Sequence, residues 1–401
     1  MISESTMNQE TCDFIKKYQN EDVRQLALQT ARYPEVDMPF ALNQIRGRKV
    51  AQTKLPSWAG VEDLIYPPHL SMEQCSSEAT ARYKASLLSS GETFVDLTGG
   101  FGVDFSFLAR SFRNAVYVER QEHLCETARH NFPLLGLSAE VVYSDGVEYL
   151  HSMNHVSVIF LDPARRNEHG GKTVFLQDCT PDVTALRDEL LEKADTVMVK
   201  LSPMLDWHEA VKTLACVSEV HIVSVENECK ELLLVMKRET VEYPTVVCVN
   251  LKGDDTEIFK FAEPVVDMSV VKKLPNLKDF NGFFYEPNAS VMKAGCFDEI
   301  ACFFKITPVG KNSHLFVSDH LIEDFPGRKF QIIAVSSMNK KELKDTMGNL
   351  NRANIAVRNF PMSAVELRKR LKLKDGGDVY LFGTTTDEGK HLLMVGKRMA
   401  C

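Results

Sequence analysis

From residue 93 to residue 237 the chain alternates short β-branched runs with helical stretches, and this alternation restricts its fold more than any other feature. Strands that are connected by helices pair in parallel, and the helices then cover both faces of the sheet. We therefore predict an α/β fold with a Rossmann-like, seven-stranded sheet. Strands are expected near residues 93–97, 115–119, 140–143, 156–161, 195–201, 219–225 and 231–237. Helices are expected near 103–111, 121–135, 145–152, 181–193 and 206–216.

The last two predicted strands are separated only by the short turn 226–230, which leaves no room for a helix. Strands connected in this way pair antiparallel. We expect them to form a hairpin at the edge of the sheet.

The regions on either side of the alternating segment have a different pattern of apolar residues. Residues 12–32 carry apolar positions at helical spacing, and Ser71-Met72-Glu73-Gln74 has the form of a capping box that would open a helix to about Leu88. Residues 241–320 are strand-rich, with strands expected at 245–250, 257–261 and 302–307. Residues 328–398 form a compact α/β set, with strands near 329–336, 353–358, 378–383 and 391–396 and helices near 339–349 and 363–372.

These changes in residue pattern along the chain predict four domains. Residues 1–90 form an N-terminal helical region, 91–240 hold the α/β sheet, and 241–325 and 326–401 are two smaller α+β domains.

Composition excludes several classes of protein. The formal net charge of −8 argues against a protein that coats nucleic acid over its whole surface. No run of about 18 apolar residues is present, and residues 1–10 lack the features of a signal peptide, so neither a membrane span nor export is expected. The 10 cysteines are scattered without a C-x-x-C pair, which predicts a reduced, cytoplasmic protein without a metal site.

The strongest functional signal is a glycine-rich turn between the first predicted strand and its helix. It reads Asp96-Leu97-Thr98-Gly99-Gly100-Phe101-Gly102. Glycines are needed where the backbone takes positive φ or approaches a ligand closely. The spacing is not G-x-G-x-x-G, and no Lys-Ser/Thr follows, so we expect a zwitterionic adenosine ligand rather than a phosphate. The alternative is a turn that serves packing alone.

This loop resembles motif I of the class I S-adenosylmethionine (SAM) methyltransferases, with Thr98 in place of the more usual first glycine. The resemblance implies SAM as the cofactor and Asp96, Thr98, Gly100, Phe101 and Gly102 as residues that bind it.

Two further acids follow neighbouring strands. Glu119 ends the second strand, 23 residues after Asp96, where a carboxylate can accept hydrogen bonds from ribose hydroxyls. Asp145, after the third strand, offers a carboxylate to an adenine amino group. The alternatives are a solvated charge at the strand end for Glu119 and an ordinary turn residue for Asp145.

The fourth strand is followed by Asp162-Pro163-Ala164-Arg165-Arg166. An acid at the carboxyl end of a central strand lies where open α/β sheets bind substrate. The run resembles motif IV of methyltransferases that act on base nitrogens, with Ala164 and Arg165 in place of the second proline and the aromatic residue. We predict catalytic roles for Asp162, Pro163 and Arg165. Arg166 would bind substrate, unless both arginines are only surface charges.

Two polar groups flank this predicted cleft. Lys200 lies near the end of an apolar strand and should reach the cleft or pair with a carboxylate, and we predict that it binds substrate. The helix before the first strand carries the polar residues Gln74, Ser76, Ser77, Thr80 and Lys84. A helix in this position covers SAM in the class that the chain resembles, or it packs with a polar outer face.

Taken together, the chain resembles a family of bacterial class I SAM-dependent methyltransferases with a THUMP-like C-terminal domain. Beyond the two motifs above, the resemblance rests on Leu70–Gln74, Tyr285–Ala289 and Asp375–Asp378. It implies a class I methyltransferase sheet, a ferredoxin-like domain at 241–325 and a THUMP-like domain at 326–401. THUMP domains bind RNA in RNA-modifying enzymes, so RNA is the implied partner by analogy.

A basic segment supports the same partner. Seven basic residues lie between Arg352 and Lys374 against the single acid Glu366. Arg368, Lys369 and Arg370 are predicted to bind RNA, unless they form the solvated face of a helix.

These observations favour a SAM-dependent methyltransferase acting on a base nitrogen of RNA, such as tRNA or rRNA. The alternatives are a DNA amino-methyltransferase, which would have to extrude its target base, and a SAM- and RNA-binding protein without catalysis.

Overall fold

The computed structural model describes residues 8–165, 175–239, 241–262, 267–348 and 350–399. The chain divides into two compact units. The first contains residues up to 220 together with 231–242, and the second contains 221–230 together with the chain from 243 onward. The four predicted domain ranges cut the chain more finely than this division and stay predictions.

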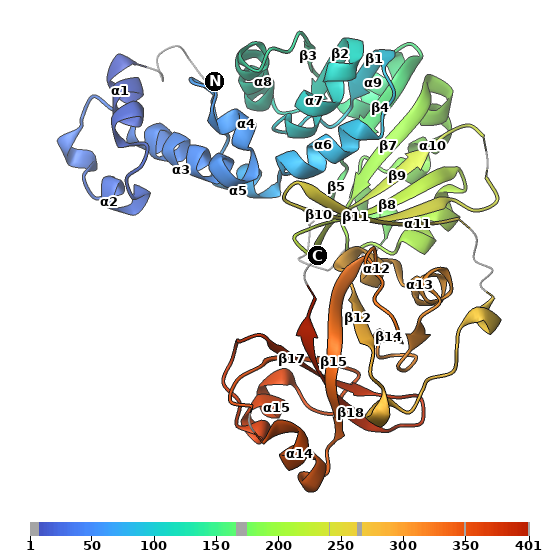
Figure 1. Cartoon of the computed structure of the whole chain (residues 1–401). Helices are drawn as coiled ribbons and strands as arrows, with labels where there is room; N and C mark the ends of the chain where they lie inside the picture. Colours follow the sequence, from blue (N-terminus) through green and yellow to red (C-terminus); the bar gives the residue numbers. More distant parts are fainter. Residues whose placement is uncertain (1–7, 166–174, 240, 263–266, 349, 400–401) are drawn as a thin grey trace. The chain divides into compact units, whose positions relative to one another are not determined.

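The first unit begins with a helical region, shown in blue in Figure 1. Its helices are α1 (Gln9–Tyr18), α2 (Val23–Ala27), α3 (Met38–Lys54), α4 (Pro56–Ala59), α5 (His69–Gln74) and α6 (Glu78–Ser86). The single helix predicted from Ser71 to Leu88 is wrong, because Ser71 lies inside α5, which ends at Gln74. The backbone is extended at Cys75 and Ser77, and the Ser77 side chain accepts a hydrogen bond from Thr80 N to cap α6 instead.

The sheet of the first unit has the predicted α/β topology. Its strands are β1 (Gly91–Asp96), β2 (Phe112–Glu119), β3 (Glu140–Tyr143), β4 (Val156–Leu161), β7 (Ala194–Leu201), β8 (Val217–Val225) and β9 (Glu228–Met236). Residues 221–230 of β8, β9 and their turn are assigned to the second unit. The hydrogen-bonded order is β3-β2-β1-β4-β7-β9, followed by β8. Strands β3, β2, β1, β4 and β7 pair in parallel, and β9 is antiparallel to β7. The seven-stranded Rossmann-like sheet is confirmed.

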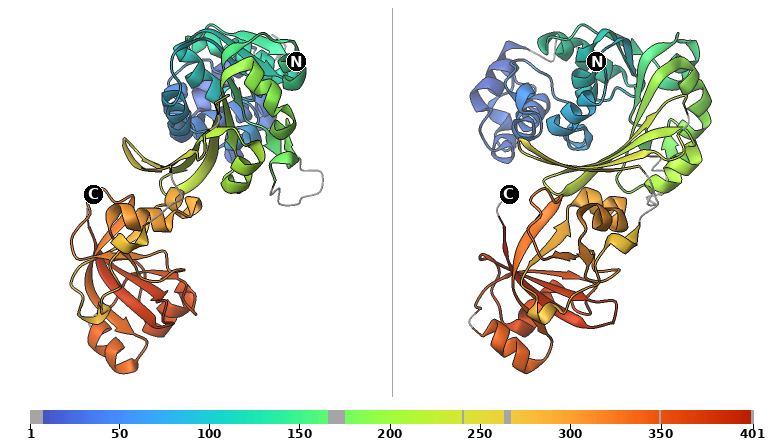
Figure 2. Two further views of the ribbon diagram at one scale, coloured as in Figure 1. Left: turned by 90° about the vertical axis from the view of Figure 1, so that its right-hand side faces the viewer. Right: turned by 45° about the vertical axis from the view of Figure 1, so that its right-hand side comes forward.

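Helices cover both faces of this sheet (Figure 1 and Figure 2). They are α7 (Val103–Leu108), α8 (Glu122–Leu134), α9 (Gly146–Ser152), α10 (Val183–Lys193) and α11 (Trp207–Leu214). The rings of Phe94, Phe105, Tyr117 and Phe132 contact one another and fix α7 and α8 against β1 and β2. Helix α10 contacts α9 and α11. This packing holds the carboxyl ends of β1, β2 and β4 rigidly side by side.

The hairpin of β8 and β9 forms as predicted, but its predicted place at the sheet edge is wrong. Its turn is the dipeptide Glu226-Asn227, and both residues have positive φ, 48° and 63°, as in a type I′ turn. Within the second unit, β10 (Thr245–Lys252) lies beside β8 and pairs antiparallel with β11 (Asp255–Phe261). Residues 246–250 of β10 are buried without alternation, so this strand is covered on both faces.

The second unit also holds a separate seven-stranded sheet in the order β13-β14-β12-β15-β18-β17-β16. Its strands are β12 (Phe283–Pro287), β13 (Thr307–Pro308), β14 (Phe316–Ser318), β15 (Gly327–Ser337), β16 (Asn354–Arg358), β17 (Val379–Thr385) and β18 (His391–Arg398). Its helices are α12 (Ala289–Ala294), α13 (Phe297–Phe304), α14 (Lys340–Met347) and α15 (Ala364–Leu371).

The predicted strand at 302–307 is wrong in its first half. The apolar run around Cys302 completes α13, which ends at Phe304. Lys305 follows as its C-cap in the left-handed conformation, and only Thr307-Pro308 is extended. A short apolar run fits a buried helix as well as a strand, which explains the error.

Among the residues that the structure describes, none of the helices combines the length and the apolar character needed to cross a membrane.

Candidate functional site

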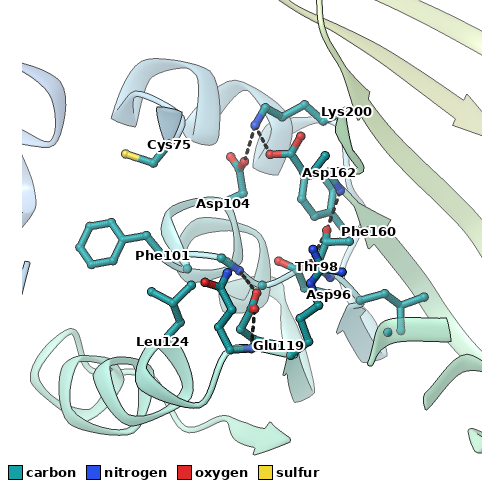
Figure 3. Close-up of a pocket in the computed structure, with 18 of the residues that line it drawn as sticks. Cys75, Asp96, Thr98, Phe101, Asp104, Glu119, Leu124, Phe160, Asp162 and Lys200 are labelled. Carbon is teal, nitrogen blue, oxygen red and sulfur yellow. Dashed lines mark hydrogen bonds and ion pairs between the residues drawn. The ribbon is translucent and has the colours of Figure 1, made fainter. Parts of the chain in front are cut away.

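A pocket of about 310 Å³ opens in the first unit at the carboxyl ends of β1, β2 and β4 (Figure 3). Parallel strands bring their carboxyl ends to one edge of the sheet, which is where open α/β folds bind ligands. The pocket gathers nine of the predicted site residues, which are Asp96, Thr98, Gly100, Phe101, Gly102, Glu119, Asp145, Asp162 and Lys200.

The glycine-rich turn is shaped by packing as well as by backbone angles. Gly100 and Gly102 have φ of 57° and 80°, in the left-handed region that favours glycine. A Cβ on Gly99 would lie 2.3 Å from the Tyr117 ring, so only glycine fits there. The Tyr117 hydroxyl donates a hydrogen bond to the Gly100 carbonyl. The turn is therefore held open toward the pocket by the aromatic core beneath it.

Thr98, the departure from the usual glycine, connects two strand ends. Its backbone N–H donates to Asp96 Oδ1 over 2.9 Å, and its hydroxyl accepts a hydrogen bond from the Asp162 N–H over 2.6 Å. A glycine at this position could not make the second contact. Thr98 therefore fixes the start of the Asp162-Pro163 turn relative to the glycine-rich loop.

The carboxylates of Glu119 and Asp145 accept hydrogen bonds from nearby backbone N–H groups. Glu119 is buried, and its two carboxylate oxygens accept hydrogen bonds from Gly100 N and Gln121 N over 2.9 and 2.8 Å. Asp145 is exposed and caps α9 by accepting a hydrogen bond from Val147 N over 2.8 Å. Both carboxylates line the pocket, and their predicted contacts with ribose and adenine stay predictions.

Five charged side chains form a chain of alternating sign that leads into the pocket, which we call the charge chain. Both oxygens of Glu231 lie within 2.7 Å of Lys84 Nζ, and Lys84 Nζ lies 3.0 Å from Asp104 Oδ1. Asp104 Oδ2 lies 3.7 Å from Lys200 Nζ, which also donates to Asp162. The side chains of Lys84 and Glu231 are 0% and 3% exposed, whereas Asp162 is 40% exposed. The charge chain therefore runs from the interior to the pocket.

The charge chain shifts the pKa values of Asp104, Lys200 and Glu231. Burial alone would raise the pKa of Asp104, but Lys84 and Lys200 outweigh it and lower that pKa. Burial alone would lower the pKa of Lys200, but Asp162 and Asp104 outweigh it and raise that pKa, so Lys200 is charged. Burial raises the pKa of Glu231, and Lys84 offsets part of that rise. Outside the charge chain, burial raises the pKa of Asp96 well above its usual range.

Some predicted residues do not meet in the pocket. Pro163 is buried behind Asp162, and the backbone of Arg165 pairs with Cys179 in the short ribbon β5 (Ala164–Arg165) and β6 (Cys179–Thr180). Arg166 lies outside the described residues.

The predicted RNA-binding residues Arg368, Lys369 and Arg370 belong to the second unit, on α15. Arg368 is half-buried and paired with Asp375, whereas Lys369 and Arg370 are exposed.

Asp104 and Glu231 were not among the predicted site residues. Asp104 lies two residues after the last glycine of the turn, and Glu231 precedes the apolar run 232–236. A charged residue at the border of such a run is the one signal that points to Glu231, since its partner Lys84 is 147 residues away.

Comparisons with known proteins agree with this architecture. A family model of THUMP domain-like sequences matches residues 327–398, and a model of a ferredoxin-like domain matches residues 283–326. The crystal structure of a candidate methyltransferase from Porphyromonas gingivalis W83 is 33% identical, with a TM-score of 0.85, over 97% of this chain and 98% of that chain.

More distant structures add nothing to the assignment. A candidate class I SAM-dependent methyltransferase from Listeria monocytogenes is 9% identical, with a TM-score of 0.39, over 61% of this chain and 94% of that chain. A search of proteins with curated function finds no match.

Identity of 33% over nearly the full length of both chains, together with the two domain matches, shows the family. This chain belongs to the bacterial class I SAM-dependent methyltransferase family that carries a ferredoxin-like domain and a THUMP-like C-terminal domain.

Proposed function

We propose that the protein is a SAM-dependent methyltransferase that modifies a base nitrogen of RNA. The observation that carries this proposal is the charge of the pocket. Five acids line it against two bases; they are Asp96, Asp104, Glu119, Asp145 and Asp162, and Arg120 and Lys200. A pyrophosphate-containing cofactor would be repelled by this lining, whereas a cationic adenosine ligand is attracted by it.

The residues present fit SAM. Glu119 would hold the ribose and Asp145 the adenine amino group, while the backbone of the turn at Gly100 would lie against the ligand. When bound, SAM supplies a methyl group on a positively charged sulfur. Burial raises the pKa of Asp96 well above its usual range, so this carboxyl contributes less negative charge than the other four acids of the lining, which still outnumber the two bases.

Asp162 is the residue best placed to orient the methyl acceptor. Its side chain is the most exposed of the charge chain; Lys200 donates to its carboxylate, and Thr98 accepts from its backbone N–H. Its carboxylate would accept a hydrogen bond from an N–H of the target nitrogen, which directs the nitrogen lone pair into the pocket. The same carboxylate would take the proton that the nitrogen releases once the new N–C bond has formed.

RNA as the substrate rests on the second unit. Its THUMP-like match and the exposed cations Lys369 and Arg370 on α15 support binding to phosphates.

The proposal is tested by incubating the purified protein with tritium-labelled SAM and separated total RNA and total DNA. We expect label in a base of RNA and, in calorimetry, saturable SAM binding. Label in DNA alone would instead identify a DNA amino-methyltransferase. SAM binding without transfer to either nucleic acid would identify a binding protein without catalysis.

A further inference from the structure

We propose that the charge chain makes the pocket prefer the cationic cofactor over its uncharged-sulfur product, S-adenosylhomocysteine. The inference rests on the proposed function and assigns a role in cofactor selection to Glu231 and Lys84, which do not line the pocket.

The charge chain carries one negative charge in excess. It contains three carboxylates and two ammonium groups, in the order Glu231, Lys84, Asp104, Lys200 and Asp162. Each ammonium group lies between two carboxylates, so neither can neutralise both of its neighbours. The excess charge is shared along the chain and is buried, apart from its Asp162 end, where water and salt screen charges poorly.

The charge chain ends where the reacting part of the cofactor must lie. Figure 3 shows Asp104, Asp162 and Lys200 gathered on one side of the glycine-rich turn and Glu119 on the other. With the adenosine held at Glu119 and Asp145, the remaining part of the pocket receives the sulfur and the amino-acid group. The amino-acid group is the same in cofactor and product. The positive charge on the sulfur is therefore the one difference that interacts electrostatically with the charge chain.

This difference has a use in turnover. The product keeps every adenosine contact and would otherwise compete with fresh cofactor. An unbalanced negative charge beside the sulfur makes binding of the neutral product weaker than binding of the cationic cofactor, without changing any contact with adenosine. Glu231 and Lys84 are positioning residues in this scheme, because they act through Asp104 and Lys200.

The test compares the dissociation constants of SAM and S-adenosylhomocysteine by calorimetry, without any nucleic acid. Glu231→Gln keeps the shape of the side chain but removes one negative charge, which balances the chain. A unit charge roughly 10 Å away in a protein interior changes an affinity about tenfold, so we expect the preference for SAM to fall about tenfold. Raising the salt concentration should change the wild-type preference little.

Two further variants separate charge from packing. Lys84→Met combined with Glu231→Gln removes one charge of each sign and restores the excess negative charge, so the wild-type preference should return. Replacing both members of a buried ion pair is tolerated better than replacing one, which covers the case in which Glu231→Gln alone fails to fold. Glu78→Gln is the matched control, because Glu78 lies on the same helix as Lys84 but pairs with Arg82, and its preference should equal the wild-type value.

The outcomes distinguish the inference from the proposed function. A folded Glu231→Gln protein with the wild-type preference would overturn the inference, as would a double variant whose preference stays low. In both cases SAM would still bind, and the proposed function would stand. A wild-type protein that binds neither compound would overturn both.

Discussion

At the scale of single residues, the sequence predicted the side chains that follow parallel strands and missed those that only tertiary packing brings near. Asp96, Glu119 and Asp162 end strands whose carboxyl ends must meet, so their gathering in one pocket follows from topology alone. The bond between Thr98 and the Asp162 N–H depends on the register of β1 with β4, and Lys84 reaches Glu231 across 147 residues. No local pattern encodes these contacts, and the roles predicted for the site residues stay predictions.

Asp96 gives a prediction about stability and pH. Burial raises its pKa in the folded state, so the folded protein holds a proton that the unfolded chain releases above about pH 4. Folding is therefore penalised increasingly as pH rises from that value toward the raised pKa. Asp96→Asn keeps the acceptor for Thr98 N but cannot ionise. We expect it to raise the melting temperature of the cofactor-free protein more at pH 8 than at pH 5. An equal change at both pH values would show that Asp96 folds as a carboxylate.

At the scale of elements, the predicted strands and helices were accurate where the spacing of apolar residues alone determines the element type. They were poor where the same residues are compatible with two assignments. The strands of the parallel sheet were found because each is a short apolar run bounded by helices. The apolar end of α13 was taken for a strand, and α5 and α6 were merged into one helix. In the second case two capping signals compete within seven residues, at Ser71 and Ser77, and the bond from Thr80 N shows that Ser77 forms the cap.

These competing signals give a prediction for two serines. Ser77→Ala removes the acceptor for Thr80 N and should lower the free energy of unfolding by about 1 kcal/mol, as for other N-caps. Ser71→Ala, inside α5, is the matched control and should change it by less than about 0.5 kcal/mol. Urea unfolding of both variants decides between them. A larger loss at Ser71 would mean that the predicted capping box forms after all.

At the scale of the whole molecule, the two C-terminal domain matches share one sheet. The ferredoxin-like match at 283–326 contributes β12, β13 and β14, and the THUMP-like match at 327–398 contributes the other four strands. Strand β12 pairs with β15 across this border. Glu286, which is 3% exposed, also bonds Arg328 and Arg358, and Arg358 comes from the far edge strand β16. The sequence predicted two α+β domains, but their joining depends on side chains distant in the chain.

This arrangement predicts that the two matched regions unfold together. Glu286→Gln leaves Arg328 and Arg358, which are about a third exposed, without their shared carboxylate and should cost about 1.5–3 kcal/mol, as for other charged hydrogen bonds. Hydrogen exchange followed by mass spectrometry should show faster exchange in β12, β15 and β16 alike. Glu388→Gln removes a carboxylate from an exposed pair with Lys390 and should leave exchange unchanged. Faster exchange confined to β12 would show that the two regions are independent.

The last prediction concerns RNA and the basic residues of α15. Arg368 is held by Asp375, so its removal would disturb α15 as well as any contact with RNA. Lys369 and Arg370 are exposed on the same helix and offer a cleaner test. Each phosphate contact on a single strand contributes about 0.7 to the slope of log affinity against log salt, so removing both cations should flatten that slope by about 1.4. Unfractionated tRNA is the probe, and binding is measured by filter retention at several salt concentrations.

Lys340→Ala with Lys341→Ala is the matched control for this measurement. It removes the same charge from α14, another exposed helix of the same sheet, and separates a local contact from a change in net charge. We expect the control to keep the wild-type slope, while Lys369→Ala with Arg370→Ala weakens binding to every RNA tested, because phosphate contacts carry no sequence information. Equal slopes for the two double variants would mean that α15 presents only a solvated basic face. If the wild-type protein fails to bind tRNA even at low salt, the analogy with THUMP domains is wrong, and a small molecule or a protein becomes the better candidate for the methyl acceptor.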